Sequence, residues 1–139
     1  MKRTSIALVV IFALGIVVGG LGHQRLSAQP EPVTRTVLLR TDVAGAEGKE
    51  AVVVFAEIAP GAITGKHLHA GQEIAYILEG SLILTANGKP AVTFKSGDAF
   101  EQPPQQVHEG LNASTTTPVK ILAFYLADKG QPLTTAVPK

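Results

Sequence analysis

The chain has 139 residues, which is enough for one domain behind an N-terminal segment, and its formal net charge is +1. It contains no cysteine, which excludes a disulfide framework and a thiol nucleophile. The sequence has no basic run and no row of aromatic residues, so it gives no indication of a nucleic-acid partner.

The first 28 residues have the pattern of an export segment. Two basic residues, Lys2 and Arg3, precede an apolar stretch at 6–22, and small residues follow near Ala28. This order is typical of a signal peptide, with the apolar stretch forming a targeting helix. A bulky leucine close to the cleavage site makes a retained membrane anchor the alternative. In either case the rest of the chain is expected outside the cytoplasm, in the periplasm or another extracytoplasmic space, and the membrane is contacted only through this segment.

The remainder of the chain is predicted to consist of strands and turns. Short segments rich in β-branched and aromatic residues are separated by turn residues, and no helical periodicity of useful length is found. Asn87-Gly88 predicts a two-residue hairpin turn. The expected strands are 33–40, 51–58, 73–78, 81–86, 91–94, 99–102, 107–110 and 119–127. About eight short strands at this spacing predict an all-β, double-sheet jelly roll.

Two of these segments are apolar on both faces, 73–78 and 121–126. In the first, Glu73 shares its face with Ala75 and an isoleucine, and the opposite face is apolar throughout. That second face carries Ile74, Tyr76 and Leu78. A strand that is apolar on both sides needs cover on both sides. The cover can come from the N-terminal strand around 37–39 or from a second copy of the chain, and a homodimer is preferred.

Candidate metal ligands lie in two glycine-bounded segments. His67 and His69 are separated by one residue, and Glu73 follows four positions later. Alternate residues of a strand point to the same face, so the two histidines are expected to project together, with Glu73 at an even offset. His108 is expected to arrive from another strand. A His-x-His pair alone is more often a solvated surface strand, but three imidazoles and a carboxylate form a ligand set for a divalent transition metal.

These segments resemble the two motifs of the cupin family. The first family pattern, G-x5-H-x-H-x3,4-E-x6-G, is matched at every position. The second, G-x5-P-x-G-x2-H-x3-N, is matched except that Gln105 stands where the family has glycine, a residue that adopts positive φ far more readily. The matching residues are Gly61, His67, His69, Glu73, Gly80, Gly97, Pro103, His108 and Asn112.

The resemblance spans about 35–127 and implies a small single-domain β-barrel. The domain organisation expected from it is a linker at 29–34, a barrel at 35–128 and a C-terminal tail at 129–139. It further implies one divalent metal ion, Fe, Mn, Ni, Cu or Zn, bound inside the barrel. The implied ligands are His67, His69, Glu73 and His108.

Several residues receive more specific expectations. In some cupins the glutamate equivalent to Glu73 also works as a base, which gives Glu73 a candidate dual role as ligand and catalytic group. Each ligating histidine needs a partner on its other ring nitrogen. Nearby candidates are Gln72, Gln102, Gln106 and Asn112, although Asn112 is better interpreted as a turn residue.

Three functions remain open at this point. The preferred one is an exported metal-dependent oxidoreductase, dioxygenase-like, that acts on a small organic molecule. The alternatives are a non-redox metal-dependent lyase or isomerase, and a binding or sensing module without turnover. One fold hosts many chemistries and does not decide among these functions. Five phenylalanines, two tyrosines and no tryptophan offer little stacking surface to a flat aromatic substrate.

Overall fold

The computed structural model describes residues 31–138, and within them the chain forms ten strands in two five-stranded antiparallel sheets. The predicted signal peptide or anchor and its helix lie outside these residues. The first sheet has the order β1 (Val33–Asp42), β2 (Lys49–Ile58), β9 (Val119–Asp128), β4 (Gln72–Glu79), β7 (Ala99–Gln102). The second has the order β10 (Thr135–Ala136), β3 (His67–Leu68), β8 (His108–Leu111), β5 (Ser81–Ala86), β6 (Val92–Lys95). The prediction of an all-β, double-sheet fold is confirmed.

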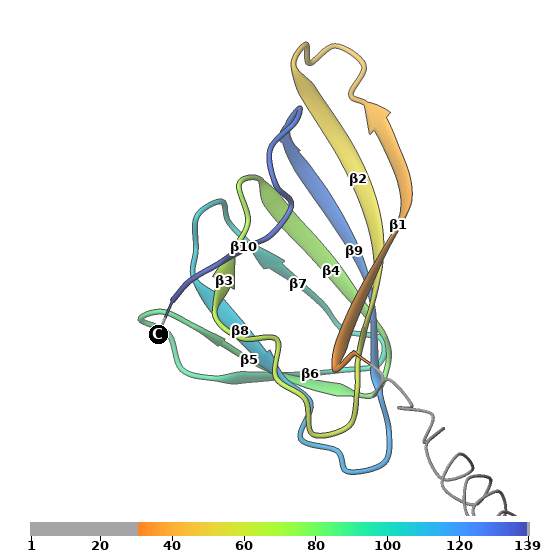
Figure 1. Ribbon diagram of the computed structural model, residues 1–139, viewed down its shortest axis with the longest axis vertical. Coiled ribbons are helices and arrows are strands. Elements are labelled where there is room, and N and C mark those ends of the chain that lie inside the picture. Colours follow the sequence, from red (N-terminus) through yellow and green to blue (C-terminus); the bar gives the residue numbers. More distant parts are fainter. Residues whose placement is uncertain (1–30, 139) are drawn as a thin grey trace, which may run out of the picture. The chain divides into compact units, whose positions relative to one another are not determined.

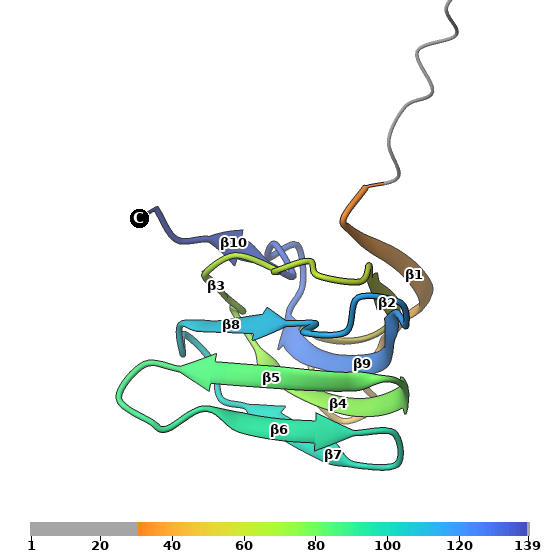
Figure 2. The same ribbon diagram turned by 90° about the horizontal axis from the view of Figure 1, so that it is seen from below.

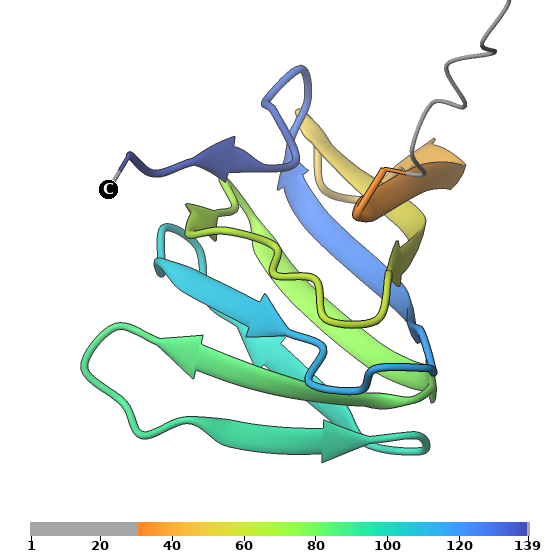
Figure 3. The same ribbon diagram turned by 60° about the horizontal axis from the view of Figure 1, so that its bottom comes forward.

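The two sheets lie face to face, as Figures 2 and 3 show. Burial alternates along the central strands with the period of two that a sheet with one covered face requires. The inward residues of both sheets form one core, whose buried members are Val52, Val54, Ile58, Ala75, Ile77, Leu82, Leu84, Val119, Ile121, Ala123 and Tyr125. The end of β1 and the beginning of β2 extend beyond the second sheet (Figure 1). Within 31–138 no helix is long and apolar enough to span a membrane.

The expected turn at Asn87-Gly88 forms, but it does not join two strands directly. Lys89 N donates to Ala86 O at 3.0 Å, and Gly88 has a φ of 75°. The β5–β6 ladder nevertheless ends at the pair Leu84 and Val92. The prediction of a two-residue hairpin is therefore wrong. The last two residues of β5 pair with β8 alone, so the turn at 87–88 lies beyond the end of the β5–β6 ladder.

The C-terminal segment, expected to be a tail, contributes strand β10. Thr135 pairs with Leu68 and Ala136 with His67, so β10 lies along the outer edge of β3. Val137 N adds a bond of 2.9 Å to Lys66 O. A strand of two residues leaves no periodic signal in a sequence, which is why it was not predicted. The contact brings the end of the described chain to the strand that carries His67.

Strand β1 pairs with the edge of β2 and does not cover the outer face of the first sheet. Its residues Val37, Leu38 and Leu39 are themselves between 50% and 58% exposed. The suggestion that they shield the outer face of β4 is therefore wrong. Among residues 31–138, no segment buries that face, on which Ile74 is exposed.

Candidate metal centre

The three histidines of the described chain meet at one place in the core. His67 and His108 are directly paired across β3 and β8, and His69 follows β3 immediately. All three side chains are buried, and their ring centroids are 4.3 to 5.1 Å apart. One ring nitrogen from each lies within 4.8 Å of the others. The prediction that these residues come together is confirmed, and the cluster could hold one metal ion.

A backbone carbonyl fixes the orientation of each ring. A carbonyl oxygen only accepts hydrogen bonds, so the Nδ1 atom facing it carries the proton and donates. Each Nε2 atom then keeps a free lone pair, which is the form of histidine that binds metals. The three contacts are His67 Nδ1 to Gly65 O at 2.8 Å, His69 Nδ1 to Leu133 O at 2.6 Å, and His108 Nδ1 to Gln106 O at 2.9 Å.

These carbonyls replace the side chains that the sequence suggested as partners. Gln72 Nε2 donates instead to Glu101 at 2.9 Å. Asn112 is fully buried and ties its loop together, since its side chain donates to Ile58 O and Thr117 O and accepts from Ser114 N. Its interpretation as a turn residue agrees with these bonds.

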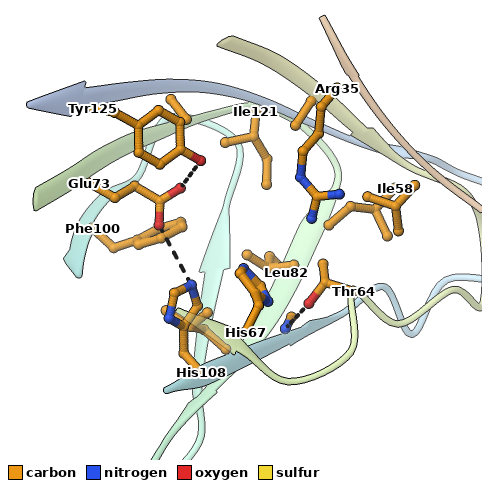
Figure 4. A pocket seen from close by; sticks show the side chains of 15 residues that line it. Arg35, Ile58, Thr64, His67, Glu73, Leu82, Phe100, His108, Ile121 and Tyr125 are labelled. Carbon is orange, nitrogen blue, oxygen red and sulfur yellow. Dashed lines mark hydrogen bonds and ion pairs between the residues drawn. The ribbon is translucent and has the colours of Figure 1, made fainter. Parts of the chain in front are cut away.

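Glu73 approaches the cluster from the opposite sheet. Its Oε2 atom lies 3.2 Å from His69 Nε2 and 3.7 Å from His108 Nε2, while Oε1 accepts a bond of 2.8 Å from the Tyr125 hydroxyl. Figure 4 shows the contacts of Glu73 with His108 and Tyr125. Within the described residues, the buried Nε2 of His69 has no hydrogen-bond partner. In a buried site, the lone pair of an imidazole nitrogen and a nearby carboxylate repel each other. A divalent cation between them would remove that cost, so the residues present fit a metal ion.

The pKa values of the buried groups favour protonation states that can bind a cation. Burial lowers the pKa of His67 to about 4 and also lowers the pKa of His108. Burial alone would raise the pKa of Glu73, but His69 and the Tyr125 hydroxyl lower it below its ordinary value. Burial and the Glu73 charge raise the pKa of Tyr125, so its hydroxyl stays a donor. At neutral pH the site therefore offers the neutral imidazoles of His67 and His108 and an ionised carboxylate.

A small cavity of about 40 Å³ lies beside these groups. His67, Glu73 and His108 line it together with Tyr125, Thr64 and Arg35 (Figure 4). The rest of the wall is apolar and consists of Val33, Ala56, Ile58, Leu82, Leu84, Phe100, Ile121 and Ala123. Apolar walls around a few polar groups are typical of a small-molecule site.

The turn before His108 adopts the conformation expected of the family motif despite its substitution. Gln105 has a φ of 64° and is the only non-glycine residue with positive φ among those described. Its amide donates to His69 O at 2.9 Å. That bond connects the segment before His108 to the segment after β3, so the turn helps to position two of the three histidines.

Sequence reasoning missed two side chains of this cavity, Tyr125 and Arg35. Tyr125 had a usable signal, because it lies an even number of residues from Ile121 and Ala123 on the inward face of β9. Arg35 had none, since its strand is exposed along most of its length. The carbonyl of Leu133 was also beyond prediction, because it lies 64 residues from His69 in the chain.

Comparison with known proteins supports the architecture. The sequence profile of the cupin domain matches residues 54–125, and no curated protein matches the chain. A cupin-like protein from Thermotoga maritima is similar, at 26% identity with a TM-score of 0.61 and 77% of each chain covered. A conserved protein with a double-stranded β-helix domain from Klebsiella pneumoniae has 23% identity and a TM-score of 0.62, with 81% of this chain and 90% of that chain covered.

The DMSP lyase DddQ from Ruegeria pomeroyi also has a similar structure, at 20% identity with a TM-score of 0.60. The match covers 76% of this chain and 52% of the lyase. Identities this low show a common fold and leave the chemistry of the individual site to its own residues.

Proposed function

We propose that this chain, which belongs to the cupin family, is an enzyme that binds one divalent transition metal ion and acts on a small organic molecule. The proposed ligands are His67, His69, His108 and Glu73. One observation carries the proposal: the buried Nε2 of His69 has no hydrogen-bond partner among the described residues and lies 3.2 Å from the Glu73 carboxylate. With both groups deprotonated that arrangement is unfavourable, and a cation between them makes it favourable.

A bound ion of this kind polarises a coordinated group, and it also exchanges electrons when it is iron, manganese, nickel or copper. The remaining functions belong to the chain itself. The Nδ1–carbonyl bonds hold the imidazoles in one orientation, and Tyr125 holds Oε1 of Glu73 so that Oε2 faces the histidines. The apolar wall excludes bulk water from the reacting groups. An oxidoreductase of the dioxygenase-like class is the first function that we propose for this site.

A non-redox lyase or isomerase is the second candidate, and the contact between Tyr125 and Glu73 favours it. A neutral hydroxyl and an ionised carboxylate lie 2.8 Å apart in the cavity wall. Such a pair can accept a proton at Glu73 Oε2 and donate one from the Tyr125 hydroxyl. In this candidate Glu73 has the dual role of ligand and base.

The test is elemental analysis of the full chain, purified without chelators or a histidine tag in a mild detergent that accommodates its apolar N-terminal segment. We expect about one metal equivalent per chain. Iron, manganese, nickel or copper together with substrate-dependent oxygen uptake would support the oxidoreductase. Zinc with turnover that consumes no oxygen would support the lyase or isomerase. Metal without turnover would identify a binding module, and no metal after anaerobic reconstitution would refute the proposal.

We also retain export as a proposal, on the basis of the sequence pattern of residues 1–28. The check is cell fractionation with and without this segment. Full-length chain in the periplasmic or membrane fraction, and truncated chain in the cytoplasm, is the expected result. Full-length chain in the cytoplasm would contradict export. Comparing the mass of the full-length product with the encoded mass separates a cleaved signal peptide from a retained anchor.

A homodimer is proposed from the uncovered outer face of the first sheet. Along β4 and β9 this face exposes Ile74, Tyr76, Leu78, Phe124 and Leu126. Charged residues border this apolar patch, namely Lys120 and Asp128 of β9 and Glu101 of β7. A contiguous apolar surface on an antiparallel sheet fits a second copy of the same face.

A further inference from the structure

Arg35 brings a positive charge to the wall of the metal-site cavity. It lies on the edge strand β1, opposite Ala56 of β2, and both residues line the cavity. Figure 4 shows its side chain extending toward His67, with the guanidinium group near Ile58 and Thr64. Arg35 is exposed, so its charge stays solvated while its side chain borders the cavity.

Within residues 31–138, no carboxylate forms an ion pair with Arg35 and no hydrogen bond of its side chain is found. The contrast on the same strand is Arg40, whose guanidinium pairs with Glu50. The one carboxylate that lines the cavity, Glu73, is already bonded to Tyr125 and faces the histidines. The guanidinium of Arg35 is therefore open to a ligand.

The charge of the whole site favours an anion. A divalent ion with three neutral imidazoles and one carboxylate has a net charge of about +1, and Arg35 adds another positive charge on the same cavity. A neutral or cationic substrate would leave both positive charges uncompensated.

A wider depression of about 530 Å³ adjoins the cavity and shares Arg35, Thr64 and His67 with it. Lys66 adds a second positive side chain there, against one carboxylate from Glu109. This depression offers an entrance beside Arg35. The inner cavity, at about 40 Å³, admits only a small group.

We propose that Arg35 binds the carboxylate of the substrate, which is a small organic acid that carries an oxygen donor for the metal a few bonds away. A guanidinium fork matches a planar carboxylate through two parallel N–H···O bonds, which gives orientation as well as affinity. The acid enters from the depression beside Lys66, with its carboxylate on Arg35 and its other end at the three histidines. This inference rests on the proposed metal-dependent function.

The experiment compares glycolate with its neutral analogue glycolamide. Each is titrated into the full chain reconstituted with Co²⁺, and the change in the visible absorption of the ion reports its dissociation constant. The same titrations are made with Arg35→Gln, with Arg35→Lys and with Lys89→Gln, a control that removes an exposed charge from the β5–β6 turn. Metal content and thermal unfolding of every sample are measured in parallel.

We expect Arg35→Gln to raise the dissociation constant of glycolate by at least about tenfold, because a charge-assisted hydrogen bond is lost. The affinity for glycolamide and the metal content should stay unchanged. Arg35→Lys should recover part of the loss and Lys89→Gln should change nothing. Equal weakening of both probes, or inorganic phosphate that binds more tightly than glycolate, would overturn the inference. NMR titration of the metal-free chain with glycolate tests Arg35 separately, so a failure of metal binding and a failure of carboxylate binding give different results.

Discussion

The two faces of strand β4 have similar side chains and opposite environments. The inner face holds Glu73, Ala75 and Ile77, all buried, although one of them is charged. The outer face holds Ile74, Tyr76 and Leu78, which are apolar and between 43% and 53% exposed. Position in the alternation of the strand, and not residue type, decides burial here. A buried carboxylate and an exposed apolar row are both unusual. The carboxylate therefore marks a candidate ligand site, and the apolar row marks a candidate protein interface.

The largest expected effect comes from removing ligands beside the inner face. The double change His67→Ala and His69→Ala removes two of the three imidazoles that the cluster contributes. Metal content should fall from about one equivalent per chain to a background level, because one imidazole and one carboxylate bind a divalent ion far more weakly. Elemental analysis gives the metal content, and far-ultraviolet circular dichroism shows that the fold persists. Metal retained by a folded double variant would place the site elsewhere.

A matched pair on β4 tests the difference in burial directly. Ile77→Ala should lower the free energy of unfolding by about 3 kcal/mol, because it removes three buried carbon atoms and leaves a cavity. Ile74→Ala, three residues away on the exposed face, should cost about 1 kcal/mol or less. Urea unfolding at equal, low protein concentration measures both. Equal costs would mean that the outer face is as well packed as the core.

The outer face is tested by adding charge. Phe124→Glu places a carboxylate among the apolar residues of β4 and β9, opposite Ile74 in the sheet. We expect the variant to be monomeric where the unaltered chain is a dimer, because a buried, unpaired charge strongly disfavours an interface. Size-exclusion chromatography with light scattering, in detergent, gives the mass. Val92→Glu, an equally exposed apolar position on β6, is the control and should remain dimeric. A monomeric unaltered chain would refute the dimer.

The buried histidines predict a loss of stability in acid. His67 has a pKa of about 4 in the folded chain, below the ordinary value of 6.5, so the unfolded chain binds more protons between these two pH values. The metal-free chain should therefore lose about 2 kcal/mol of stability as the pH falls from 6.5 to 4, with partial solvent screening included. The lowered pKa of Glu73 acts in the same direction. His67→Gln removes this group, and urea unfolding should show a weaker pH dependence. An unchanged pH dependence would contradict the assignment.

The smallest effect is expected at the turn before His108. Gln105→Gly should raise the free energy of unfolding by about 0.5 kcal/mol, because relief from a positive φ outweighs the entropy that glycine loses on folding. Gln106→Gly, the adjacent position without positive φ, should lower it by up to about 1 kcal/mol. Thermal unfolding of the two variants distinguishes them by sign. Destabilisation by Gln105→Gly would mean that contacts of the glutamine side chain stabilise the fold by more than the positive φ destabilises it.

The motif residues were predictable because their chemistry and spacing are local. His67 and His69 alternate along one short segment, and the glycines around them mark turns. Gly80 illustrates why such a residue is needed, since it has a φ of 82° and a Cβ atom there would lie 2.4 Å from Pro118 O. The strand segments were predictable for the same reason, through their period of two and their β-branched residues.

The components that the sequence did not predict come from distant segments. Leu133 O fixes the ring of His69, the hydroxyl of Tyr125 fixes Glu73, and Arg35 adds its charge from an edge strand. Each contact depends on how two sheets pack, and a single sequence contains no periodic trace of such packing. The same is true of β10, whose two residues form a strand only because β3 offers an unpaired edge.

The sequence by itself therefore determined the candidate ligands, the inward parity of the strands and the family, because these depend on residue chemistry and on spacing along one strand. The tertiary structure alone decided which nitrogen of each imidazole is free, which carboxylate oxygen faces the rings and which positive charge enters the cavity. It also decided that β1 extends the sheet and leaves its outer face open. Those outcomes depend on hydrogen bonds and contacts between residues far apart in the chain, which only the packing of the two sheets brings together.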